Sequence, residues 1–391
     1  MSFSTLEKKV TGIVSLILSL RLLGLFMLLP IFSIYAIDYE NSNAFLAGVA
    51  IGVYSLSQAI MQIPLAYLSD KIGRRVVVLI GLGFFTIGSL ICYVANDINL
   101  LIFGRVIQGC GAISSVGVAT LAENTNENNR ASAFTIVGLS VGVAFVIGFL
   151  IGPFLSYLFN FKILFLLLFF FGILAILCAS FLYPEGKIIT KDVEKRDPFR
   201  MNSDMVKIYS ASFMLSIILS IFLFIYPLMW KDLGKSTNEL SIVYLIVFLP
   251  AAIFIYPSIR YLEKIKRIDI STSFGWIFLF ISFLSFLFVE RNIFSLYLLA
   301  IFFFLGSTIF HSTLPSLLSL KVSEKMRATG NGPYYIMSFL GHAIGSIIAG
   351  FFYSKAEYFG FSNYASLIFL CLMIVTVWTI VGLPKHNSIK E

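Results

Sequence analysis

A compact charged segment is the first candidate for chemistry in this sequence. It reads Ser69-Asp70-Lys71-Ile72-Gly73-Arg74-Arg75 and lies between two apolar runs of about membrane-spanning length. We predict that Asp70 ends one helix, that Gly73 lets the chain reverse, and that Arg74 and Arg75 place positive charge beside the bilayer. The alternative is an ordinary solvated turn whose charges only set the membrane topology.

A weaker copy of this segment follows about half of the 391-residue length later. Pro257 to Ile268 again contains a proline, an acid at Glu263 and a Lys-Ile pair, but it lacks the glycine. This spacing indicates a chain built twice from one unit. Two parallel halves are one way in which transporters are made, with the substrate site at their interface near the bilayer midplane.

Two arginines lie inside apolar runs, where a charge is costly unless it faces water or a partner. For Arg21 the alternative is snorkelling, in which the side chain reaches the headgroups. Arg105 shares a helix face with Gln108, because the two are three residues apart. We predict that both arginines face a substrate cavity.

A polar stripe marks the second apolar run, because Tyr54, Gln58 and Gln62 recur every four residues. We expect this stripe to face the same cavity. The full set of predicted substrate-binding residues is Arg21, Tyr54, Gln58, Gln62, Arg105, Gln108, His311 and Tyr335.

Proton coupling needs a titratable group within the membrane. All 20 acidic residues fall in loops or at the ends of apolar runs, so only His311 and His342 titrate near neutral pH inside them. We predict that His311 carries the coupling proton, with Arg105 and His342 as further candidates. Either histidine could instead be a hydrogen-bonded core residue, and for His342, on a glycine-rich face, we favour that alternative.

The elements that position these residues are membrane helices. With 59% hydrophobic and 12% charged residues the chain is an integral membrane protein, and no window alternates as membrane β-strands do. We predict an all-α membrane protein with 12 transmembrane helices. The predicted spans are residues 12–36, 45–68, 76–95, 100–122, 132–158, 162–183, 208–230, 241–260, 272–289, 293–317, 332–354 and 363–384.

The loops divide these spans and orient them. Residues 184–207 form the only long polar segment, so we predict a six-helix bundle at 1–183, a cytoplasmic linker at 184–207 and a second six-helix bundle at 208–391. Most of the 28 Lys and Arg fall on one side, which predicts that both termini are cytoplasmic in a bacterial inner membrane. The formal net charge of +8 is therefore a topology signal, and no nucleic acid is expected as a partner.

Small residues predict close helix packing at Gly148, Gly152 and Pro153, and again at Gly341 and Gly345. The four cysteines lie within apolar runs without metal-ligand spacing. We expect no metal and no cofactor. A membrane enzyme is disfavoured, because the apolar runs contain no set of residues that is typical of catalysis.

Several motifs together resemble the major facilitator superfamily across the chain. Ser69 to Arg75 resembles its loop signature, Arg105-x-x-x-Gly109 its fourth-span signature, and Gly148-x-x-x-Gly152-Pro153 the end of the signature of antiporters. The closest resemblance is to the 12-span drug:proton antiporter branch. The run from Leu20 to Pro30 is similar to that of YajR-type exporters, in which an acid can stand where this chain has His311.

The resemblance implies a gate and its residues. Asp70 would face the start of the eleventh helix at Gly330 to Gly332, and Arg74 would pair with Glu123 at the end of the fourth span. The predicted gating set is Asp70, Gly73, Arg74, Arg75, Glu123, Arg130 and the second-copy Glu263.

We therefore expect a secondary active transporter, a proton-coupled exporter of a small organic molecule or drug. One alternative is a transporter of organic anions, siderophores or other metabolites, by export or by proton symport. Another is a sensor or scaffold of the same fold that does not transport. The expected partners are the lipid bilayer, a small-molecule substrate and protons, and we expect a monomer.

Overall fold

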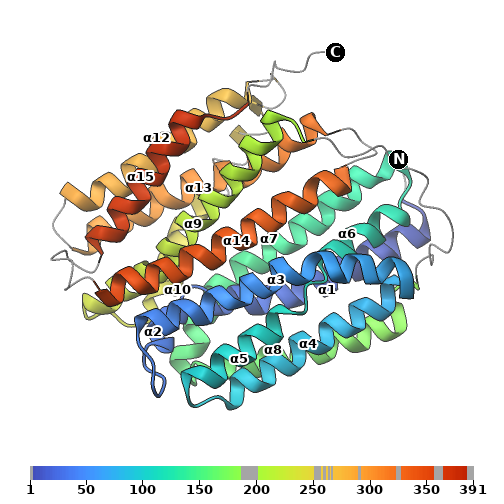
Figure 1. The fold of residues 1–391 in the computed structure, drawn as a ribbon, viewed down its shortest axis with the longest axis horizontal. Coiled ribbons are helices and arrows are strands. Elements are labelled where there is room, and N and C mark those ends of the chain that lie inside the picture. Colours follow the sequence, from blue (N-terminus) through green and yellow to red (C-terminus); the bar gives the residue numbers. More distant parts are fainter. Residues whose placement is uncertain are drawn as a thin grey trace. The chain divides into compact units, whose positions relative to one another are not determined.

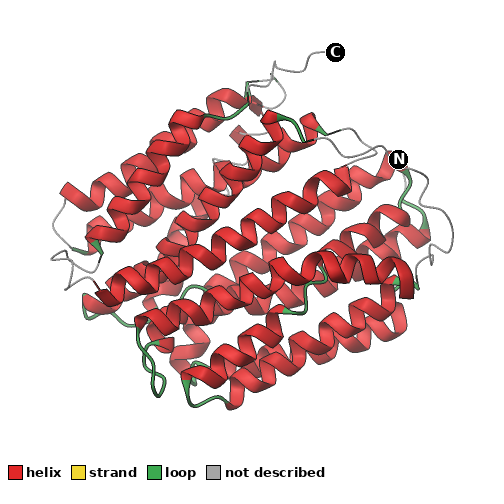
Figure 2. Cartoon of the chain, in the orientation of Figure 1, coloured by secondary structure: helices red, strands yellow, loops and turns green. Residues whose placement is uncertain are grey.

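The computed structural model describes residues 3–185, 201–250, 257–258, 261–262, 265, 267–288, 292–322, 327–355 and 364–384. Over these residues the chain is helical, with short loops and one isolated bridge between Glu40 and Asp97 (Figure 2). The all-helical prediction is confirmed. The chain divides into two compact units: Met1–Ser42 with Val53–Asp197, and Asn43–Gly52 with Pro198–Glu391.

The first unit contains helices α1 to α8, apart from the first turns of α3 (Figure 1). Helix α1 packs against α7 and α8, and α4 packs against α5 and α8. The core between them is aliphatic, with Val14, Leu82, Val116 and Ala179 all buried in one cluster. The bounds are α1 Thr5–Leu28, α2 Phe32–Ala36, α3 Ala44–Ile72, α4 Arg74–Val94, α5 Ile98–Gly109, α6 Ser114–Glu123, α7 Glu127–Leu158 and α8 Lys162–Leu182.

The second unit has a more aromatic core. Helix α9 packs against α14 and α13, and α12 packs against α13. Phe222 of α9 stacks on Phe303 of α13 with ring centroids 3.8 Å apart, and Phe304 meets Phe222 edge-on. The bounds are α9 Ser203–Asp232, α10 Glu239–Pro250, α12 Ile268–Phe288, α13 Ile293–Lys321, α14 Arg327–Lys355 and α15 Ala365–Val381.

The described helices follow the predicted spans in order, with the first span divided into α1 and α2 and the fourth into α5 and α6. Nine are long and apolar enough to cross a membrane, and Glu239–Phe248, Ile270–Phe286 and Ala365–Val381 are shorter apolar helices. Helix α9 begins at Ser203, so its first turn lies within the segment predicted as a linker. Residues 186–200 of that segment lie outside the described residues. The division at 1–183, 184–207 and 208–391 stays a prediction.

The predicted fourth span is broken into α5 and α6 between residues 110 and 113. Glycines at the break allow unusually close backbone contacts. A Cβ on Gly109 would lie 2.4 Å from the carbonyl oxygen of Tyr54, and one on Gly111 would lie 2.5 Å from that of Gly81. The break therefore sets Arg105 and Gln108 on α5 and Ser114 on α6.

Glycines also bring helices together within each unit. In α7, a Cβ on Gly152 would lie 2.1 Å from the carbonyl oxygen of Met27, and one on Gly148 would meet Phe26. Pro153 follows Gly152 inside the same helix. In α14, a Cβ on Gly341 or Gly345 would lie 2.4 or 2.6 Å from a carbonyl oxygen of α9. These glycines remove the side chain where two helix backbones touch.

A ladder of polar contacts reinforces the pairing of α9 with α14. Its three steps are four residues apart on each helix, so they lie on one face of each. The steps are Ser212 Oγ donating to the Tyr334 carbonyl oxygen at 3.4 Å, Ser216 with Ser338 at 2.9 Å, and Ser220 with His342 Nδ1 at 2.8 Å.

An acid in the first turn holds the start of the first helix in each unit. Glu7 of α1 accepts from the backbone N–H of Asn126 at 2.9 Å and from the Asn129 side chain at 3.1 Å, at the start of α7. Asp204 of α9 pairs with Lys321, the last residue of α13, at 2.8 Å. Each acid also lies at a helix N-terminus, where the helix dipole favours negative charge.

Replacing Gly152 tests the α1–α7 contact. Gly152→Ala should destabilise the detergent-purified protein by about 1–3 kcal/mol, because the added Cβ collides with the Met27 backbone. The destabilisation is measured as a lower thermal unfolding midpoint. Gly142→Ala, on the same helix, is the control, because no atom lies within 4 Å of its Cβ. Equal midpoints for the two variants would show that α1 and α7 do not pack this closely.

Candidate functional site

The turn between α3 and α4 is built around Gly73, which has φ +98°. Residues with a side chain rarely adopt this conformation, so the glycine allows α3 to end at Ile72 and α4 to begin at Arg74. The Arg74 side chain is 6% exposed. A guanidinium keeps its charge when buried, so it needs anionic or polar partners.

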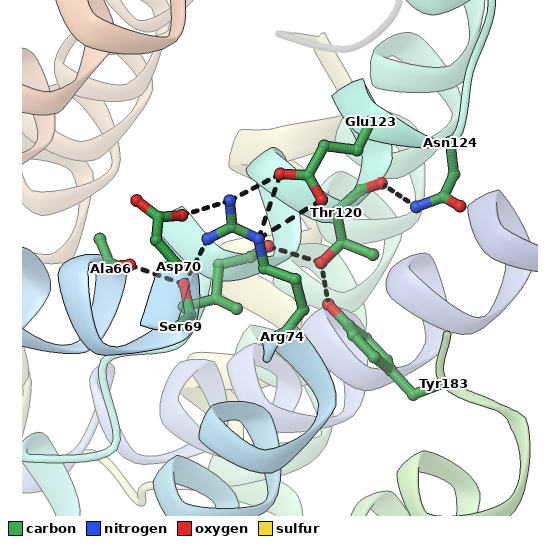
Figure 3. Close-up of polar contacts among 9 residues, drawn as sticks. Ala66, Ser69, Asp70, Arg74, Thr120, Glu123, Asn124 and Tyr183 are labelled. Atoms are coloured by element: carbon green, nitrogen blue, oxygen red, sulfur yellow. Dashed lines mark hydrogen bonds and ion pairs between the residues drawn. The ribbon is translucent and has the colours of Figure 1, made fainter. Parts of the chain in front are cut away.

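Glu123 and Asp70 provide those partners (Figure 3). Arg74 Nη2 lies 2.6 Å from Glu123 Oε1 and 2.5 Å from Asp70 Oδ1, and Arg74 Nε lies 3.2 Å from Glu123 Oε1. Arg74 Nη1 donates to Ser69 Oγ. One side chain thereby ties the end of α3, the start of α4 and the end of α6 together.

A second layer of hydrogen bonds positions these groups. Ser69 Oγ donates to the Ala66 carbonyl oxygen at 2.7 Å. Tyr183 donates to Thr120 Oγ1 at 2.9 Å, and Asn124 donates to the Thr120 carbonyl oxygen at 2.8 Å (Figure 3). We call Ser69, Asp70, Arg74, Thr120, Glu123, Asn124 and Tyr183 the Arg74 cluster.

The cluster presents negative charge outward. Its two carboxylates share one buried guanidinium, and the Asp70 side chain is 45% exposed. Asp70 can therefore meet another group while it holds Arg74. The predicted partner at the start of α14 belongs to the second unit, and that contact stays a prediction.

The other predicted gating residues lie near the cluster or outside the described residues. Arg75 makes an exposed ion pair with Glu185 at 3.5 Å. Arg130, near the start of α7, donates to the Thr125 carbonyl oxygen at 3.4 Å. Glu263 lies outside the described residues.

Arg105 lies in a closed cage in the first unit. Its guanidinium carbon lies 4.3 Å from the ring centroid of Tyr54 and 5.2 Å from that of Phe32. Its Nη1 donates to Gln108 Oε1 at 2.5 Å, and Gln108 Nε2 donates to Ser89 at 2.9 Å. The two aromatic rings and the amide stabilise this buried cation.

The polar stripe of α3 runs from the Arg105 cage to the break in the fourth span. Gln58 donates to the Tyr54 hydroxyl at 2.8 Å. Ser115 of α6 donates to the backbone oxygen of Gln62 at 3.4 Å. Six of the eight predicted substrate residues thus belong to the first unit.

Arg21 differs from the other two arginines. It is 1% exposed, and its Nη1 donates to Ser114 Oγ at 3.4 Å. Its Nε and Nη2 have no hydrogen-bond partner among the described residues. Its orientation toward a substrate cavity stays a prediction.

The second unit contains the remaining predicted substrate-binding and proton-coupling residues, His311, Tyr335 and His342. His311 lies on the exposed side of α13 with Pro315, beside half-buried Ser312. His342 is held by Ser220, as the core interpretation expected. Tyr335 of α14 is 42% exposed. The predicted roles of His311, Arg105 and His342 in proton coupling stay predictions.

Sequence reasoning missed several of the residues that make these contacts. The capping pattern of Ser4 with Glu7 is visible in the sequence, but the contact of Glu7 with the start of α7 spans 119 residues. Tyr183, Thr120 and Ser114 carry no local signal. Among the described residues, no group of three His, Cys, Asp or Glu side chains can hold a metal ion.

Neutralising Glu123 tests the Arg74 cluster. Glu123→Gln should destabilise the purified protein by about 1–3 kcal/mol, because buried Arg74 loses a charged hydrogen-bond partner. Glu185→Gln is the matched control, since its side chain is 86% exposed and its pair with Arg75 should contribute less than about 0.5 kcal/mol. The cluster is wrongly described if both variants unfold at the wild-type temperature.

Comparison with known proteins covers both units. A model of the Major Facilitator Superfamily matches residues 14–201 and 208–391. An "uncharacterized transporter" of Buchnera aphidicola (subsp. Baizongia pistaciae) is 32% identical over 393 residues, 96% of each chain. The inner membrane transport protein YajR of Escherichia coli is 28% identical over 396 residues, 98% of this chain and 84% of YajR. The quinolone resistance protein NorA of Staphylococcus aureus is 24% identical over 338 residues, 84% of this chain and 86% of NorA.

The family model covers nearly the whole chain, and the helices and the loop signature agree with it. The chain therefore belongs to the Major Facilitator Superfamily of membrane transporters.

Proposed function

We propose that this protein is a proton-coupled secondary transporter that exports a small organic molecule across the bacterial inner membrane. The observation that carries the proposal is the Arg74 cluster, a buried guanidinium held by two carboxylates from different helices. A turn that only sets the membrane topology needs positive charge near the bilayer but no buried ion pairs. It suits a gate that must close firmly in one state and open in another.

The proposed gate works by differential stabilisation. With the gate closed, exposed Asp70 meets the N-terminus of α14, where unpaired N–H groups favour an anion. When the gate opens, that contact is lost while Glu123 keeps Arg74 neutralised. A difference of about 1.4 kcal/mol between the two states shifts their ratio about tenfold.

The proposed orientation places both termini and the Arg74 cluster in the cytoplasm. The support is the gathering of Lys and Arg on that side of the predicted spans. The inner membrane is supported by the name of the relative YajR.

Export is favoured over import by the α7 pattern and by a relative. Gly148, Gly152 and Pro153 resemble the end of the antiporter signature, and Gly152 lies against the α1 backbone. NorA is named for quinolone resistance. The alternative, transport of an organic anion, is favoured by the unpaired donors of Arg21.

The proposed proton carrier is His311. It lies on a face of α13 that is exposed and carries Ser312 and half-buried Thr308. Polar groups in a membrane helix usually face a watery path. His342 is the less suitable carrier, because Ser220 engages its Nδ1.

The function is tested with purified protein in proteoliposomes under a pH gradient. A screen of lipophilic cations against carboxylate metabolites, including polycarboxylate siderophores, should find a substrate whose addition changes the luminal pH. A non-transporting sensor would bind ligands and produce no such change.

Asp70 is the first test of the gate. Asp70→Asn should insert normally and reduce transport about tenfold or more, because the amide removes the anion that the helix terminus favours. Glu185→Gln, an equally neutralising change on the same side of the unit, should transport normally. Near-normal turnover by Asp70→Asn would reduce the segment to a topology signal.

His311 tests the coupling. His311→Ala should abolish transport driven by a pH gradient and leave substrate binding intact, because no group on that face of α13 then changes protonation. Ser319→Ala is the control on the same helix, since its hydroxyl only bonds the Ser316 carbonyl oxygen. If His311→Ala still concentrates substrate, the proton is carried by His342, by the Asp70 and Glu123 carboxylates, or by the substrate.

A further inference from the structure

The guanidinium groups of Arg21 and Arg74 have similar partners at Nη1 but different surroundings at Nε and Nη2. In both, Nη1 donates to a serine, Ser114 for Arg21 and Ser69 for Arg74. In Arg74 the Nε and Nη2 atoms bind the carboxylate of Glu123. In Arg21 the same two atoms have no partner among the described residues.

The unfilled edge has a specific shape. The N–H bonds on Nε and Nη2 point in parallel from one side of the planar guanidinium, at the spacing of two carboxylate oxygens. Arg74 shows that this protein fills such an edge with a carboxylate. Arg21 therefore offers the geometry of an Arg–carboxylate pair with the acid missing.

Burial makes the empty edge costly. Arg21 is 1% exposed, and a guanidinium cannot give up its proton at any usable pH. Arg105, the other deeply buried arginine of the unit, has its charge covered by Tyr54, Phe32 and Gln108. Among the described residues nothing forms a hydrogen bond with this edge, so an external anion can complete Arg21 in the same way as Glu123 completes Arg74.

We propose that the Nε and Nη2 edge of Arg21 binds the carboxylate of the transported molecule, so that the substrates are organic carboxylates. The assignment rests on the proposed transport function. The substrate reaches the edge as the helices around α1 separate, and its carboxylate takes the place that Glu123 has at Arg74. A cation lacks the oxygens for this edge and is repelled by the Arg21 charge.

The test measures binding without transport. A thiol-reactive dye reports unfolding of the purified protein, because Cys92 and Cys371 are free and buried. Millimolar benzoate and acetate should raise the unfolding midpoint of the wild type, whereas benzamide and acetamide, their neutral counterparts, should not. Binding to the native state alone produces such a shift.

Two variants and a control locate the effect. Arg21→Gln should lose the benzoate shift, and Arg21→Lys, which keeps the charge without the fork, should need about tenfold more benzoate. Lys8→Gln removes one charge from the exposed start of the same helix and should keep the wild-type response. If Arg21→Gln does not fold, Arg21→Lys still decides the question.

Several results would overturn the proposal. These are equal shifts with benzoate and benzamide, no shift with either carboxylate, or a wild-type response in Arg21→Lys. Chloride or inorganic phosphate reproducing the benzoate shift would make this a general anion site. A benzoate shift without proton-driven transport would overturn the proposed function alone, and proton-driven transport without the shift would overturn the carboxylate assignment alone.

Discussion

The neutralisation of the buried Arg74 charge is the interaction that joins the end of α3, the start of α4 and the end of α6 in the first unit. A guanidinium that is 6% exposed must be neutralised within the protein, and removing one partner of such a group leaves a charge that water cannot reach. The need to neutralise it holds α3, α4 and α6 in one arrangement, and Tyr183 after α8 completes the layer around it. Gly73 supplies the conformation that turns the arginine back toward its partners.

Among its described residues the first unit contains three buried arginines, and their surroundings differ. Arg74 is held by carboxylates, which fixes a structure but leaves Asp70 exposed for a second contact. Arg105 is covered by two aromatic rings, and its Nη1 donates to the Gln108 amide oxygen. Arg21 keeps two donors without partners. A buried charge without a partner costs stability, and this cost is the basis for the proposal that Arg21 binds an anion.

Hydrophobic periodicity and run length were sufficient to predict the helices. Apolar runs long enough to cross the membrane must form helices there, because the bilayer offers the backbone no other hydrogen-bond partners. The pairing of Arg74 with Glu123 followed from the resemblance of the loop signature. Contacts between distant residues did not follow from either source. Glu7 reaches Asn126, and Ser114 reaches Arg21, only because folding brings separate helices together. The break between α5 and α6 was also missed, since the residues around Gly111 are as apolar as those of an intact span.

The two units share a structural device and differ in their chemistry. An acid in the first turn ties the first helix of each unit to the end of another helix, through Glu7 at the start of α7 in one and through Asp204 at the end of α13 in the other. The buried polar groups diverge instead, with arginines in the first unit and the serine ladder with His342 in the second. A guanidinium keeps its charge and an imidazole titrates near neutral pH. The roles proposed for Arg21 in anion binding and for a histidine in proton transfer therefore fall on groups in which the two units differ.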